Sequence, residues 1–159
     1  MIRYGLIFGI LIFFFNQVVA QDLKTINDPD TIWIRICKNA NIKLRDSLQQ
    51  NYITILLENY KTEKAITLLN RYEKSNNNVK SKAFVYYVKG DLFCLNGQLD
   101  SSFVLLTKAQ EIYQEQNDLY WLSSVYQKLT LLCSYQKRWL LATDYIFKAI
   151  KIAQTAKDV

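Results

Sequence analysis

A stretch of this chain returns, altered, 40 residues further along. Residues 83–118 align with residues 123–158 at that offset, and several of the shared positions, such as 85 and 92 or 108 and 112, have spacings that put them on one face of a helix. The identical pairs are Val85/Val125, Tyr86/Tyr126, Leu92/Leu132, Lys108/Lys148, Ala109/Ala149, Ile112/Ile152, Gln114/Gln154 and Asp118/Asp158. A period of this length is typical of stacked helix–turn–helix units.

Each copy has the pattern of two antiparallel helices joined by a short turn. The sequence predicts turns at Asn96–Gly97 and at 136–138, and a break between the two copies at 116–118. Residues 46–80 repeat the same plan more weakly, about 37 residues earlier, with a turn at 59–62. We therefore expect three helix pairs, at about 46–80, 83–118 and 123–158.

Composition supports an all-α fold. Only one Pro and four Gly occur in 159 residues, which suits long helices and short turns. Half of the residues are hydrophobic, so the chain can form a packed core. An ordinary helical bundle remains the rival architecture.

The segment before the repeats, residues 21–45, is expected to be a polar leader followed by one helix. Asp28 would cap that helix and Pro29 would take its first position. The isoleucines at 32, 34 and 36 alternate as in a strand, but the segment also keeps a helical face. Because no second strand is in sight to pair with, helix is the favoured interpretation.

The first twenty residues have the order of a secretory signal peptide. Arg3 supplies a positive charge, residues 4–15 are an unbroken apolar run, and Val18 and Ala20 are the small or medium residues that precede a cleavage site. An uncleaved membrane anchor is the alternative, although twelve apolar residues are short for a span of about 20. We expect cleavage near Ala20/Gln21 and export, to a periplasm or the exterior.

The charge and the reactive residues limit the function classes. The net charge of +6 is spread along the chain without a basic run, so we expect a solvated basic surface and no nucleic-acid partner. There is no His, the commonest general base and metal ligand. Three Cys, at 37, 94 and 133, fit no metal motif and are expected to be buried thiols. With no Gly-rich phosphate loop either, we expect no enzyme, no cofactor and no metal site.

The repeat resembles the tetratricopeptide family. Its signature positions are filled by small residues where helices cross closely and by aromatic residues between them, and the ones expected to pack the repeats are Tyr86, Gly90, Phe93, Gly97, Ala109, Tyr126, Ala142 and Ala149. The resemblance covers residues 46–159. It departs from the family pattern at Lys89, Thr130 and Tyr72, and the usual closing Pro is missing.

The resemblance implies a right-handed α-solenoid of antiparallel helix pairs, with a concave face lined by the first helix of each pair. It places a partner-binding groove at Phe84, Tyr87, Asp91, Leu95, Gln127, Leu131 and Tyr135. The family's carboxylate clamp is absent, because Tyr87, Val88 and Asp91 stand at its positions. Such a groove would hold a protein or peptide ligand. Some of these residues could instead be core.

Two functions follow as expectations. The first is an exported, non-catalytic protein–protein interaction module. The second is the extracytoplasmic input region of a larger bacterial signalling protein, a histidine kinase or a DNA-binding regulator, because a signal peptide followed by 40-residue repeats resembles such regions. At the C-terminal end, Tyr145, Ile146, Ile150 and Ile152 would leave apolar surface open. Further repeats or self-association could cover it.

Overall fold

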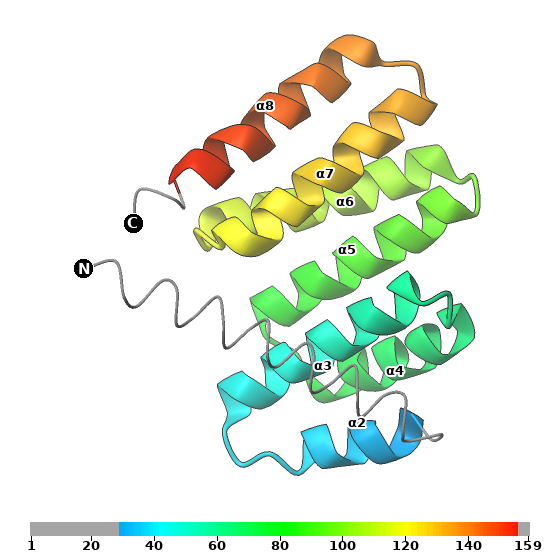
Figure 1. Cartoon of the computed structure of the whole chain (residues 1–159), viewed down its shortest axis with the longest axis vertical. Helices are drawn as coiled ribbons and strands as arrows, with labels where there is room; N and C mark the ends of the chain where they lie inside the picture. Colours follow the sequence, from blue (N-terminus) through cyan, green and yellow to red (C-terminus); the bar gives the residue numbers. More distant parts are fainter. Residues whose placement is uncertain (1–28, 156–159) are drawn as a thin grey trace. The chain divides into compact units, whose positions relative to one another are not determined.

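The computed structural model describes residues 29–155, and within this range it is all-helical (Figure 1). The helices are α2 (Pro29–Cys37), α3 (Ile42–Glu58), α4 (Thr62–Ser75), α5 (Val79–Leu95), α6 (Leu99–Glu115), α7 (Leu119–Tyr135) and α8 (Trp139–Thr155). The expected all-α class is confirmed for these residues. The expected signal peptide, its cleavage site and the cap at Asp28 lie outside the described range.

The chain divides into two compact units, with the boundary inside α3 between Tyr52 and Ile53. In the first unit, the segment whose sequence pattern is ambiguous is the helix α2, which begins at Pro29 as expected. Pro suits this position because the first helical N–H has no partner within the helix. The expectation that all three cysteines are buried is wrong for Cys37, which is exposed. It is the last residue of α2, and its sulfur accepts a hydrogen bond from Gln49 at 3.3 Å.

The second unit is highly regular. Helices α5 to α8 each have 17 residues, and the turns between them are three residues long. In Figure 1 each of these helices lies beside the one before it, and side-by-side packing holds for α5 with α6, α6 with α7 and α7 with α8. The start of each helix is therefore separated from the next by 20 residues, so a helix pair repeats every 40.

One turn geometry recurs in this unit. The left-handed residue of each turn donates its N–H to the third carbonyl before it, and the next residue donates to the fifth. These two bonds satisfy carbonyls that the end of a helix leaves open. The left-handed residues are Tyr60 (φ 57°), Gly97 (φ 74°), Asn117 (φ 50°) and Lys137 (φ 57°). The turns predicted at 59–62, 96–97, 116–118 and 136–138 are confirmed.

Close approach of α5 and α6 depends on Gly90. A Cβ at this position would lie 2.8 Å from Cγ of Leu106, a side chain with no exposed surface. On the same crossing, the Ser102 hydroxyl donates a hydrogen bond of 2.7 Å to the Gly90 carbonyl. A glycine and a serine thus let the two helix backbones meet where larger residues would separate them.

The other residues expected to pack the repeats differ in burial. Ala109, Tyr126 and Ala142 are buried, while Tyr86, Phe93 and Ala149 are half-buried. Gly97 is exposed, and its role is the left-handed turn. Within the described range, no helix is both long and apolar enough to span a bilayer.

Candidate partner-binding groove

A groove of about 480 Å³ lies in the second unit, between the end of α3 with its turn, α5 and α7. Tyr87, Asp91 and Leu95 line it from α5 at intervals of four residues, the spacing of one helix face. The remaining lining residues are Thr54, Leu57, Glu58, Tyr60, Thr62, Tyr120, Trp121, Ser124, Gln127 and Lys128. Four of the seven groove residues expected from sequence, Tyr87, Asp91, Leu95 and Gln127, are therefore brought together.

The other three expected residues lie elsewhere. Phe84 has no exposed surface, so its assignment to an open groove is wrong. Its ring packs edge-on against Tyr72 at 5.5 Å and Trp121 at 5.1 Å, which makes it core beneath the groove. Leu131 and Tyr135 are exposed but lie outside the groove, on the last turns of α7.

Aromatic rings form one wall of the groove. Trp121 is the centre of this wall, and its ring centroid lies 5.5 Å from that of Tyr87 and 5.3 Å from that of Tyr120, both in edge-to-face geometry. Trp121 is 9% exposed, whereas Tyr120 is 68% exposed. The wall is therefore fixed at its base by packing and offers a free ring at its rim.

A charged pair crosses the groove. Nζ of Lys128 on α7 lies 2.7 Å from the Asp91 carboxylate on α5, and both side chains are partly shielded from water. A charge-assisted hydrogen bond of this length is stronger than a neutral one. The pair joins the two helices and neutralises most of the field of each partner.

The Tyr87 hydroxyl faces this groove without a partner. The residue is only 8% exposed, and among the described residues its hydroxyl makes no hydrogen bond. Burial raises the pKa of Tyr87 strongly, and the carboxylates of Asp91 and Glu58 raise that pKa further. The hydroxyl is therefore a neutral phenol at physiological pH, able to donate and to accept a hydrogen bond.

Sequence reasoning missed Glu58, Tyr60, Tyr120, Trp121 and Lys128. Tyr120 could have been found, because it stands four residues before Ser124 on the helix face from which Gln127 was chosen. Glu58 and Tyr60 come from the weakest repeat. Their place in the groove follows only from the packed structure, and no repeat signal marks it.

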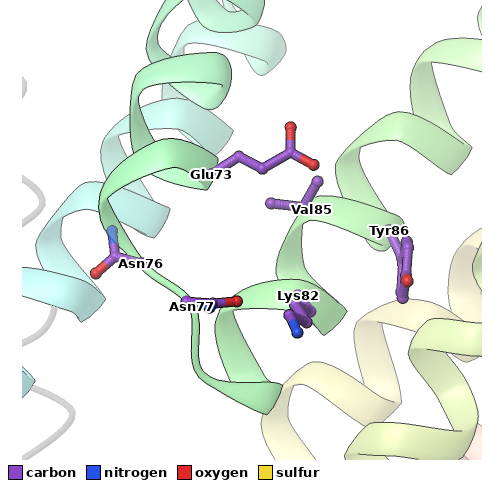
Figure 2. Close-up of a pocket in the computed structure, with 6 residues that line it drawn as sticks. All are labelled: Glu73, Asn76, Asn77, Lys82, Val85 and Tyr86. Atoms are coloured by element: carbon purple, nitrogen blue, oxygen red, sulfur yellow. The ribbon is translucent and has the colours of Figure 1, made fainter.

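A second hollow, of about 250 Å³, lies where α4 passes into α5 (Figure 2). It is lined by Glu73, Asn76, Asn77, Lys82, Val85 and Tyr86. Two of its polar groups are already engaged. Glu73 holds Lys89 with both carboxylate oxygens at 2.9 Å, and the Asn76 amide donates to the Tyr72 carbonyl at 3.1 Å. Figure 2 shows Asn76 pointing away from Lys82. This hollow is a helix junction with little free chemistry.

Reactive groups elsewhere are sparse in the described part of the chain. Burial raises the pKa of the Cys94 and Cys133 thiols, so both stay protonated at neutral pH and are poor nucleophiles. No three His, Cys, Asp or Glu side chains within residues 29–155 lie close enough to hold a metal ion. Comparisons with models of protein families, with curated proteins and with solved structures find no match for this chain. Function is therefore inferred from the geometry of the groove.

Proposed function

We propose that this chain is a non-catalytic protein-interaction module that binds an extended peptide segment of a partner protein in the groove between α3, α5 and α7. The observation that carries the proposal is the groove itself, in which one fixed aromatic wall faces a small set of polar groups. Pockets of about 300–1,000 Å³ that combine an apolar lining with a few polar groups are the usual form of ligand sites.

The helix register supports a repeat of the tetratricopeptide type for α5 to α8. The turns recur with one geometry, and small residues occupy the closest helix crossing at Gly90 and Ser102. In a stack of such pairs, the first helices α5 and α7 would lie on the same side, and both line the groove. The proposed architecture is therefore a right-handed α-solenoid, as in that family.

A peptide suits the groove better than a small metabolite. The groove is open, and its lining comes from the end of α3 with its turn and from one face each of α5 and α7. An extended peptide could place alternate side chains against the rings, and its backbone N–H and C=O groups could form hydrogen bonds with the side chains of Gln127 and Ser124. We propose that binding takes place after export, in the periplasm or outside the cell.

Selection of displayed random peptides on the full chain tests this proposal. Tyr120→Ala should weaken selected peptides at least several-fold, because it removes the exposed ring at the rim. The matched control is Tyr135→Ala, which removes an exposed tyrosine of the same helix that lies outside the groove. Peptides that bind equally well to both variants, or an absence of selected peptides, would reject the groove as the binding site.

A second proposal concerns the outer face of α8, which is apolar and exposed. Trp139, Ile146, Phe147 and Ile150 are between 44% and 65% exposed, and Leu140 is 92% exposed. Trp139 and Phe147 alone leave roughly 250 Å² of aromatic surface in water, taking about 200 Å² for a whole aromatic side chain. With the three aliphatic residues the patch approaches the apolar share of a stable dimer interface, in which each partner buries about 800 Å².

We propose that a second copy of this chain covers the α8 face, through an isologous contact. The sequence predicts that four residues of this helix leave apolar surface exposed. Two of them, Ile146 and Ile150, are exposed, whereas Tyr145 is buried and Ile152 is half-buried. Under the alternative function, the input region of a larger signalling protein, further repeats would cover the same face. Sedimentation velocity of the full chain distinguishes these, because a monomer at tens of micromolar rejects the dimer.

A further inference from the structure

The charge of the groove is opposite in sign to that of the chain. The whole chain carries a formal charge of +6, yet the charged residues that line the groove are Glu58, Asp91 and Lys128. Lys128 is paired with Asp91, which leaves the charge of Glu58 uncompensated within the lining. A groove with one free carboxylate in a basic protein favours a positively charged ligand.

The position of Glu58 strengthens the negative potential. Glu58 is the last residue of α3, where the helix dipole places partial negative charge and where an acidic side chain is unfavourable by itself. Its carboxylate is exposed and makes no ion pair with any residue in the described range. A cation at this point would interact favourably with the carboxylate and with the end of the helix.

Tyr87 is an independent indication of a ligand. The residue is more than nine-tenths buried and lines the groove, and its hydroxyl makes no hydrogen bond with the described residues. The ring of Tyr87 is buried, but its hydroxyl is not among the sealed polar atoms of the core, so a ligand in the groove can reach it and supply the bond. The hydroxyl lies within electrostatic range of both the Asp91 and the Glu58 carboxylates. Its oxygen can accept a hydrogen bond from a cationic N–H group.

The ring wall fits the same ligand. Tyr120 and Trp121 are neighbours on α7, and Tyr120 presents an exposed ring at the rim. Cations are attracted to the faces of Trp and Tyr, and arginine is the side chain most often found there.

We propose that the groove contains a subsite for one cationic side chain of the partner, an arginine or a lysine, held between the Glu58 carboxylate, the Tyr87 hydroxyl and the exposed ring of Tyr120, with Trp121 as the packed base of the wall. This subsite rests on the proposed peptide-binding function and names the chemistry that it recognises. An anionic side chain is disfavoured there, because it would meet Glu58 and would have to displace Asp91 from Lys128.

A small probe tests the subsite without a peptide. The full chain contains three Trp residues, so its nitrogen-15 spectrum has three indole signals, and Trp121→Phe assigns one of them. N-acetyl-arginine methylamide should shift the Trp121 signal saturably. N-acetyl-citrulline methylamide has the same shape without the charge, and should bind about two- to fivefold or more weakly, as expected for loss of an exposed cation–π contact.

Three variants locate the charge. Glu58→Gln should weaken the arginine probe by roughly three- to tenfold, because it removes the uncompensated carboxylate. Lys128→Gln should strengthen binding by about threefold, because it frees Asp91. Tyr87→Phe should weaken binding while it leaves the ring packing unchanged. The control is Glu111→Gln, which removes the same charge from an exposed residue of α6 outside the groove and should have no effect.

The outcomes separate the subsite from the proposed function. Equal binding of the arginine and citrulline probes, or an unchanged affinity in Glu58→Gln, overturns the cationic subsite. Groove-dependent peptides that are not enriched in arginine or lysine also overturn it, although the interaction module then stands. If the arginine probe binds as expected while no displayed peptide is selected, the subsite is supported and peptide binding is rejected.

Discussion

Replacing Gly90 with alanine tests the close crossing of α5 and α6. The new Cβ would lie 2.8 Å from Cγ and 3.0 Å from Cδ2 of Leu106, and 3.4 Å from its backbone nitrogen. Real Cβ atoms do not tolerate the shortest of these contacts, so something must move. Leu106 has no exposed surface, which leaves its side chain little room to turn aside. The strain therefore passes to the two helix backbones.

Two effects of opposite sign set the size of the change. Overpacking a core position costs about 1–3 kcal/mol. Alanine in place of glycine inside a helix stabilises by about 1 kcal/mol. We expect the strain to win, with a net loss of about 1 kcal/mol in the free energy of unfolding. In a domain of this size such a loss lowers Tm by roughly 4 °C.

A double-mutant cycle isolates the contact. Leu106→Ala removes both Cγ and Cδ2, at a cost of about 2–5 kcal/mol for the lost packing. In that background Gly90→Ala meets no close side chain and should stabilise by up to about 1 kcal/mol. Gly90→Ala should therefore destabilise the protein that has Leu106 and stabilise the protein that has Ala at position 106. The difference between these two effects, the coupling free energy, is about 2 kcal/mol.

Urea unfolding followed by circular dichroism measures all four proteins. Gly97→Ala is the matched control, because Gly97 has a φ of 74° and a Cβ added there would have no atom within 4 Å. It should cost about 1 kcal/mol through backbone strain alone, equally in both backgrounds. The reasoning is refuted if Gly90→Ala stabilises the protein that retains Leu106, or if its effect is the same with and without that side chain.

Three further predictions concern a turn, the buried thiol and phenol groups, and the α8 face. Lys137→Gly should raise the free energy of unfolding by about 0.5–1 kcal/mol, measured by urea unfolding, because φ is 57° there; a loss would contradict the turn geometry. Stability should fall with rising pH above about pH 8.5–10, where unfolded thiols and phenols ionise. The sign follows because burial raises the pKa of Cys94 and Tyr87, so the folded state keeps protons that the unfolded state has lost; thermal melts at pH 7 and pH 10.5 with equal Tm would contradict this. Phe147→Asp should convert the proposed dimer to monomer in sedimentation velocity, since it places a charge in the apolar α8 face, while Glu111→Gln should leave the mass unchanged.

The helices and turns were predictable because they depend on local signals. Apolar spacing locates α5 to α8, and the breaks at 116–118 and 136–138 interrupt it. The left-handed residue is Asn117 in the first of these turns and Lys137 in the second. Lysine is not a usual left-handed residue, so the register of the repeat, and not the residue type, identifies that turn.

The groove was only partly predictable, because a helix has more apolar positions than one packing face needs. Phe84 and Tyr87 lie one turn apart on α5, and both contact Trp121. Periodicity alone assigns both to the same face. Burial separates them, since Phe84 also meets Tyr72 of α4 and is sealed, while Tyr87 keeps its hydroxyl end at the groove. The contact with α4 is non-local, and a pattern of spacings within α5 does not contain it.

Comparison of the two copies explains why architecture was easier to infer than binding. Among the positions that are identical at the 40-residue offset, Val85/Val125 is buried in both copies and Ala109/Ala149 is buried or half-buried, while Lys108/Lys148 and Gln114/Gln154 are exposed. The groove positions differ in every copy: Tyr87 stands against Gln127, Asp91 against Leu131, Leu95 against Tyr135, Lys128 against Val88 and Trp121 against Ser81. A repeat preserves the residues that its helices need in order to stack, and leaves the positions that line a groove freer to vary. The chemistry of recognition therefore lies where the internal repeat is weakest, and Glu58, from the most divergent repeat, is the residue whose charge decides the proposed ligand.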